Sequence, residues 1–169
     1  MPRGLRSDLP DGIFHVTCRG TGGIHVFLDD LDRGAFTLLL KQTADLFAVR
    51  LVAWCVLGTH FHVIADCRRE DLSRAMHRLN GLYAQRFNKR HGRRGHLFEE
   101  RFSSWVITSE EHLEAAIAYV IENPVAAGLC RDAREWAWSW PRLNPPSLLD
   151  TRGTVPGTWP EQAGVSPAS

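Results

Sequence analysis

The chain has 169 residues and a mass of 19.1 kDa, which fits one compact domain with an appended segment. Its 20 Lys and Arg residues nearly balance its 19 Asp and Glu residues, so a nucleic-acid partner must be argued from local charge. No stretch approaches the ~18 apolar residues of a membrane span. The opening MPRGLRSDLPDG also lacks the apolar core of a secretory leader. We therefore expect a cytoplasmic protein without a membrane partner.

The distribution of cysteine and of turn-forming residues sets further expectations. The four cysteines are scattered, with no CxxC pair, which predicts reduced thiols and no disulfide framework. After about Pro145 the composition shifts to Pro, Gly, Ser and Thr. We expect one domain over residues 1–143 and a disordered C-terminal segment over residues 144–169.

The first half of the chain predicts a strand, a helix and a strand pair. A β-branched and aromatic run indicates a strand over Gly12 to Arg19, after a Pro-Asp-Gly turn. Apolar residues at helical spacing predict a helix from about Asp30 to Ala48. Two apolar runs, 49–58 and 60–66, meet at a short Gly-Thr break and predict a hairpin.

The second half predicts two helices with a strand between them. Apolar residues that step by four, three, four and four predict a helix from about Asp71 to Arg90. A strand is expected over 102–107, and Thr108 with Glu111 fits a capping box that opens a third helix. That helix should end near Asn123, because the residue before a proline disfavours helical geometry. The order predicts an α+β fold, a mainly antiparallel sheet with helices packed on it.

The sequence His60-Phe61-His62 is the first candidate for chemistry. On a strand, residues i and i+2 point to one side, so both imidazoles would face the same space. Two convergent imidazoles form half of a metal site. The pattern alone fits two polar residues on a solvated strand equally well. Cys67 is a weaker candidate for a further ligand.

A tyrosine and an asparagine on the third helix are the second candidate. Tyr119 and Asn123 lie four residues apart and therefore share a helix face. They flank the expected apolar stripe, so the tyrosine could reach a site on the adjoining sheet. By itself this pattern fits an amphipathic tyrosine at the core edge better than it fits a nucleophile.

Local charge is the third feature. Between Arg74 and Arg101 there are eight basic residues and only two acidic ones, with aromatic residues interleaved. Basic side chains follow phosphates, and aromatic rings stack on unpaired bases. A solvated helix face is the simpler explanation, but Gly92 and Gly95 place part of this charge on a loop. The expected DNA-binding residues are Arg86, Lys89, Arg90, Arg93, Arg94 and Arg101.

Taken together, these motifs resemble the small HUH-type single-strand DNA transposases of the insertion-sequence tyrosine transposase family, in particular the REP-associated tyrosine transposase branch. The similarity runs in order through most of residues 13–140. It includes the segments FHVTCRG, AWCVLGTHFHVIAD, LNGLYAQRFNKRHGRRGHLFEERF, AYVIENPVAAGL and WAWSW.

The resemblance implies a ferredoxin-like sheet of the HUH endonuclease architecture. It assigns metal ligation to His60 and His62, nucleophilic attack to Tyr119 and a third ligand to Asn123. It further implies a 5′-phosphotyrosine intermediate, a free 3′-OH, a divalent Mg²⁺ or Mn²⁺, and single-stranded or hairpin DNA as substrate. Imidazole ligands suit Mn²⁺ better than Mg²⁺. Small relatives occur as dimers and as monomers, so the resemblance allows either a homodimer or a monomer.

Other functions fit parts of the pattern. A domesticated single-stranded nucleic-acid binder would keep the fold without cutting DNA. A metal-dependent phosphodiesterase would attack with water and would not need Tyr119. Replication initiators and relaxases share the chemistry, but they usually order the histidine strand differently or carry appended domains.

Overall fold

A computed structural model describes residues 11–141 of the chain. The elements are β1 (Gly12–Arg19), α1 (Asp30–Leu46), β2 (Arg50–Val56), β3 (His60–Cys67), α2 (Arg69–His91), β4 (Ser103–Ile107), α3 (Glu110–Ala126) and β5 (Ser139–Trp140), with 3-10 turns at Thr21–Gly23 and Ala133–Glu135. The expected C-terminal segment 144–169 lies outside the described residues. Within the described part, no helix is both long and apolar enough to cross a membrane.

All five strands join one antiparallel sheet in the order β4-β1-β3-β2-β5. The first six main elements follow the β-α-β-β-α-β pattern of a ferredoxin-like fold. This confirms the predicted α+β class with a mainly antiparallel sheet. None of the four cysteines, which all lie within residues 11–141, is in a disulfide bond.

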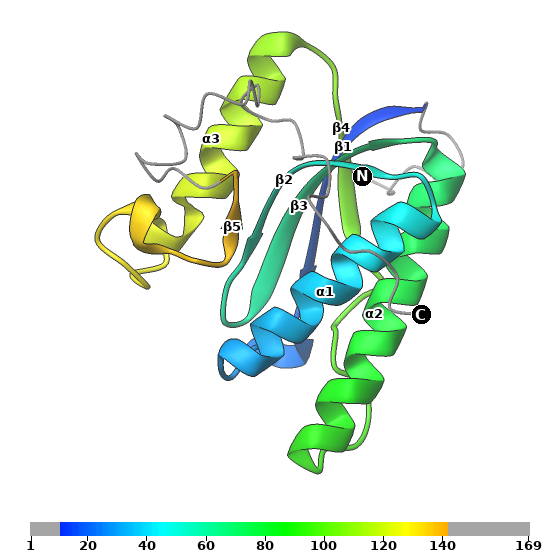
Figure 1. Ribbon diagram of the computed structural model, residues 1–169, viewed down its shortest axis with the longest axis vertical. Coiled ribbons are helices and arrows are strands. Elements are labelled where there is room, and N and C mark those ends of the chain that lie inside the picture. The colour runs from blue at the N-terminus through cyan, green and yellow to red at the C-terminus, as the bar shows by residue number, and fades with distance from the viewer. Residues whose placement is uncertain (1–10, 142–169) are drawn as a thin grey trace, which may run out of the picture.

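The sheet separates two layers of helices (Figure 1), with α1 and α2 on one face and α3 on the other. Successive strand residues point to opposite faces, so one strand serves both layers. In β3, Phe61 and Val63 join the core beneath α1 and α2, whereas Ile64 joins the smaller core beneath α3. His62 lies between Phe61 and Val63 and therefore faces the α3 layer.

Aromatic side chains fill the core on the α1 and α2 face. Phe36 and Phe61 are fully buried, and their ring centroids lie 4.6 Å apart. Tyr83 is buried on α2, and its hydroxyl donates a 2.5 Å hydrogen bond to the carbonyl of Val26. Tyr83 therefore packs the core.

Both predicted boundaries of α3 are wrong. The N-cap is Ser109, whose hydroxyl accepts from the amide of His112, so the cap lies one residue after Thr108. The helix continues through Pro124 to Ala126. Proline removes one amide donor, but the helix ends only where Gly128 adopts a φ of 70°. The amides of Gly128 and Leu129 then donate to the carbonyls of Val125 and Pro124, which is a Schellman motif.

The chain returns to the sheet after α3 as β5, a two-residue strand that the sequence did not predict. β5 pairs with β2 through Trp54↔Trp140 and Cys55↔Ser139. Two neighbouring tryptophans strengthen the attachment, because Trp136 Nε1 donates to the carbonyl of Val56 and Trp138 Nε1 donates to Asp30. The helix α3 is therefore flanked in sequence by β4 at one sheet edge and β5 at the other.

Candidate active site

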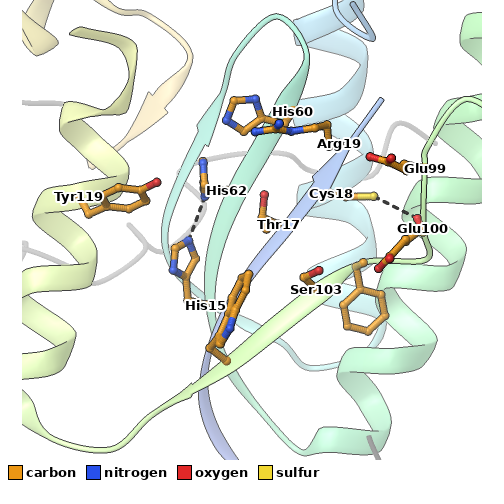
Figure 2. Close-up of a pocket in the computed structure, with 12 residues that line it drawn as sticks. His15, Thr17, Cys18, Arg19, His60, His62, Glu99, Glu100, Ser103 and Tyr119 are labelled. Carbon is orange, nitrogen blue, oxygen red and sulfur yellow. Dashed lines mark hydrogen bonds between the residues drawn. The ribbon is translucent and has the colours of Figure 1, made fainter. Parts of the chain in front are cut away.

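Three histidines from two neighbouring strands meet on the face that α3 covers. The register of β1 and β3 pairs Thr17 with His62 and Arg19 with His60. His15 is two residues before Thr17, so it points to the same face and is a diagonal neighbour of His62. Figure 2 shows the three rings gathered at this place, with the hydroxyl of Tyr119 directed toward His62.

In both His60 and His62, Nδ1 lies within hydrogen-bond distance of a neighbouring side chain. His62 Nδ1 lies 3.0 Å from His15 Nε2, and His60 Nδ1 lies 2.9 Å from the hydroxyl of Thr59. Nε2 of His62 is buried and has no hydrogen-bond partner. A buried nitrogen without a partner is costly unless a ligand binds it. The sequence could not decide between a metal site and a solvated strand face, and this burial argues for a site.

Burial keeps these rings neutral. It lowers the pKa of His62 to about 3, with help from the neighbouring His60, His15 and Arg19. Burial, followed by the charge of Arg19, lowers the pKa of His60 to about 4. The pKa of His15 is also lowered, first by burial and then by His112. A neutral imidazole has a free lone pair on one nitrogen, which is the form that binds a metal ion.

Tyr119 approaches the histidines from α3. Its ring centroid is 5.5 Å from that of His62 and 5.9 Å from that of His15, both edge-on. The residue is 56% exposed, although the next residue along the helix, Val120, is fully buried. Packing of the Val120 side of α3 on the sheet therefore places Tyr119 at the rim of the histidine cluster, where an incoming substrate can reach it.

Asn123 lies one helical turn after Tyr119 and is buried. It does not line the pocket that contains His60, His62 and Tyr119. Among residues 11–141, no three His, Cys, Asp or Glu side chains are grouped to hold a metal ion. Cys67 packs against the core under α1 and α2, on the face opposite to His62. A cation on the two histidines would thus need an oxygen ligand of another residue type, or from substrate or water.

The pocket has a volume of about 450 Å³ and includes residues that sequence reasoning missed. Arg19 lies at one end beside His60, and the ring of Trp105 is tilted against that of His15 with centroids 5.8 Å apart. Glu99 and Glu100 lie on the side of the pocket away from Tyr119 (Figure 2). The strand alternation of β1 was the available signal, because it places His15, Thr17 and Arg19 on the face of His60 and His62.

The six predicted DNA-binding residues lie along α2 and the following loop, and none lines this pocket. Arg86, Lys89, Arg94 and Arg101 are exposed. Arg90 instead forms ion pairs with Asp29 at 2.6 Å and Asp32 at 2.5 Å, which join α2 to the start of α1. Arg93 donates to the carbonyl of His96 at 3.0 Å within the loop.

A second groove of about 740 Å³ lies between α2 and the segment 95–102, and Arg101 lines it. Glu99, Glu100 and Phe102 contact both this groove and the histidine pocket. Arg101 is therefore connected to the histidine pocket through residues shared by the two hollows, whereas Arg86, Lys89 and Arg94 line neither of them.

Comparison with known proteins agrees with this architecture. Residues 13–123 match the family described as IS200-like transposases. The structure resembles that of a REP-associated tyrosine transposase bound to a REP hairpin, with a TM-score of 0.69, 18% identity, and coverage of 94% of this chain and 91% of that chain. A protein described as a transposase from Deinococcus radiodurans R1 aligns with a TM-score of 0.47 and 22% identity, over 73% of this chain and 95% of that chain. No curated protein matches the chain.

Proposed function

Because the chain belongs to the IS200-like transposase family, we propose that it cuts and rejoins single-stranded or hairpin DNA with Tyr119 as the nucleophile. The observation that carries this proposal is the arrangement of Tyr119 beside His62, whose buried Nε2 has no partner. An exposed phenol next to two neutral imidazoles fits nucleophilic attack on a phosphodiester. The REP hairpin bound by the similar transposase supports hairpin DNA as a substrate class.

In the proposed reaction, the Tyr119 oxygen attacks phosphorus and the bond from phosphorus to the 3′ oxygen breaks. The phenol proton passes to a base or to water, and the departing 3′ oxygen takes up a proton to become a 3′-OH. The DNA 5′ phosphate is then esterified to Tyr119. Attack by the 3′-OH of another strand reverses these steps, so rejoining needs no ATP.

His60 and His62 fit a divalent cation, because burial keeps both rings neutral and their Nδ1 atoms are already engaged. A bound Mg²⁺ or Mn²⁺ would neutralise charge on the scissile phosphate and orient it. We propose Asn123 as a further ligand, supported by its position one turn after Tyr119. Arg19 is the nearest basic side chain in the pocket and would bind the flanking phosphate.

We propose that Arg86, Lys89, Arg94 and Arg101 bind the DNA backbone outside the pocket, since all four are exposed. Arg90 and Arg93, also expected from the sequence, have partners within the fold, so their contribution to binding should be smaller.

The test is incubation of the full chain with labelled single-stranded hairpin oligonucleotides and Mn²⁺, followed by a denaturing gel. We expect a covalent protein–DNA adduct that is absent in Tyr119→Phe and in His60→Ala. Tyr83→Phe is the matched control, because it changes the other tyrosine of the chain and should still form the adduct. Cleavage without an adduct would indicate a water-using phosphodiesterase, and binding without cleavage would indicate a non-cutting DNA binder.

A further inference from the structure

His15 lies outside the HFH motif, yet it makes the direct hydrogen bond of the cluster. Its Nε2 is 3.0 Å from Nδ1 of His62. Each neutral imidazole carries one N–H and one lone pair, so the protonated nitrogen of His62 decides which atom can bind a cation. If Nδ1 of His62 carries the proton, its buried Nε2 presents a lone pair to the pocket. If Nε2 carries the proton, the same atom is a buried donor without an acceptor.

We propose that His15 is a positioning residue that accepts the Nδ1–H of His62 and thereby fixes His62 in the tautomer whose Nε2 binds the cation. This inference rests on the proposed function in one respect, the binding of a cation by His60 and His62. It adds a residue from a different strand to the site and gives that residue a defined role. Ligand histidines commonly donate their second N–H to an acceptor, which sets both tautomer and ring orientation.

The surroundings of His15 suit this role. Its ring lies 5.8 Å from Trp105 on β4, which is opposite His15 in the strand register, and 5.9 Å from Tyr119 on α3. The ring is therefore held between a neighbouring strand and the helix that carries the nucleophile. A ring packed in this way has few alternative rotamers, and the acceptor stays in line with His62.

The first measurement reads the tautomer of His62 in the metal-free full chain by long-range ¹H–¹⁵N NMR of the histidine rings. We expect His62 to carry its proton on Nδ1 before any ion is added. In His15→Phe, which keeps an aromatic ring but removes the acceptor, His62 should change to the Nε2–H form or to a mixture. Wild-type His62 found as Nε2–H would overturn the proposal, even if no variant folds.

The second measurement is Mn²⁺ affinity, determined by titration of wild type, His15→Phe and His15→Gln. We expect roughly 10–100-fold weaker binding in His15→Phe. His15→Gln should recover much of it, because the amide oxygen can accept the Nδ1–H. His77→Phe is the matched control, since His77 is exposed on α2 outside the histidine pocket and should leave both measurements unchanged. Equal Mn²⁺ affinity in wild type and His15→Phe would contradict the proposal.

Neither measurement contains DNA, so the two proposals can fail separately. A chain that has the expected His62 tautomer and Mn²⁺ affinity but forms no adduct would refute the cutting reaction alone. A chain that forms the adduct while His15→Phe leaves the tautomer and the affinity unchanged would refute the role of His15 alone.

Discussion

The two faces of the sheet are built from the same strands but differ in the side chains that they bury. Under α1 and α2, Phe36, Phe61 and Tyr83 are buried, and the Tyr83 hydroxyl has an acceptor. Under α3, the apolar contacts give way to a histidine cluster in which Nε2 of His62 has no partner. The comparison teaches that strand alternation lets one sheet bury an aromatic core on one side and gather three histidine rings on the other.

The largest expected effects come from comparing one substitution on each face of the sheet. Phe36→Ala removes a fully buried ring and should lower the free energy of unfolding by about 3–5 kcal/mol. Tyr119→Phe removes a hydroxyl from an exposed side chain and should change stability by less than about 0.5 kcal/mol. It should nevertheless reduce DNA cleavage on the order of 10⁴-fold or more. Urea unfolding and adduct formation measure the two effects, and a loss of stability in Tyr119→Phe would break the comparison.

A smaller effect is expected from pH. The unfolded chain protonates His62 near its ordinary pKa of 6.5, whereas burial lowers the pKa in the folded chain to about 3. The unfolded state therefore binds more protons as the pH falls from about 6.5 toward 3, and stability decreases over that window. For full burial the loss is on the order of 2 kcal/mol at pH 5.

Chemical unfolding of the metal-free protein at pH 7.5 and pH 5 measures this loss. His62→Gln should reduce the pH dependence, with the remainder due to His60 and His15, whereas His77→Gln, on the exposed surface of α2, should leave it unchanged. Equal slopes in His62→Gln and wild type would show that His62 is not buried as a neutral ring.

Two arginines of the basic segment, Arg94 and Arg90, allow a second comparison with smaller expected effects. Arg94 is exposed, so Arg94→Ala should reduce the slope of log affinity against log salt concentration by about one and leave the melting temperature unchanged. Arg90 pairs with Asp29 and Asp32, so Arg90→Met should lower the melting temperature and change the salt slope less. DNA-binding titrations at several salt concentrations and thermal melts test the pair. A steeper loss of slope in Arg90→Met would place Arg90 on the DNA.

The smallest expected effect concerns the end of α3. Gly128 has a φ of 70°, and an added Cβ would meet no atom within 4 Å. Gly128→Ala should therefore cost only the backbone strain, about 1 kcal/mol. Pro124→Ala should leave the helix end in place, because Gly128 and not Pro124 ends the helix. Backbone NMR shifts for residues 124–129 would show whether the end moves in either variant.

Most of the fold was predictable because its signals are local. The strand at Gly12–Arg19 begins after a turn and consists largely of β-branched and aromatic residues, and the prediction matches its bounds. The five apolar residues of the α2 stripe, from Leu72 to Phe87, are all buried. The strand β5 escaped prediction because two residues carry no periodicity, and its partners Trp54 and Cys55 lie far away in the sequence.

The site was predictable only in part, for a similar reason. His60, His62 and Tyr119 meet as expected, since the spacing within β3 and the apolar stripe of α3 are local patterns. His15 was missed because its place beside His62 depends on the register between β1 and β3, which no local pattern specifies. The pairing of Arg90 with Asp32 was missed because it joins two helices through tertiary packing.

The helix α3 is joined at each end to a strand of the same sheet, and this bears on how the rate of DNA cutting would depend on protein concentration. The helix runs between β4 and β5, two strands of the same sheet, and brings Tyr119 to His62 of its own chain. The proposed nucleophile and the imidazoles therefore lie together within this one chain. If the proposed reaction uses this arrangement, each folded molecule carries a whole reaction centre, and we expect the rate of adduct formation per molecule to stay constant on dilution.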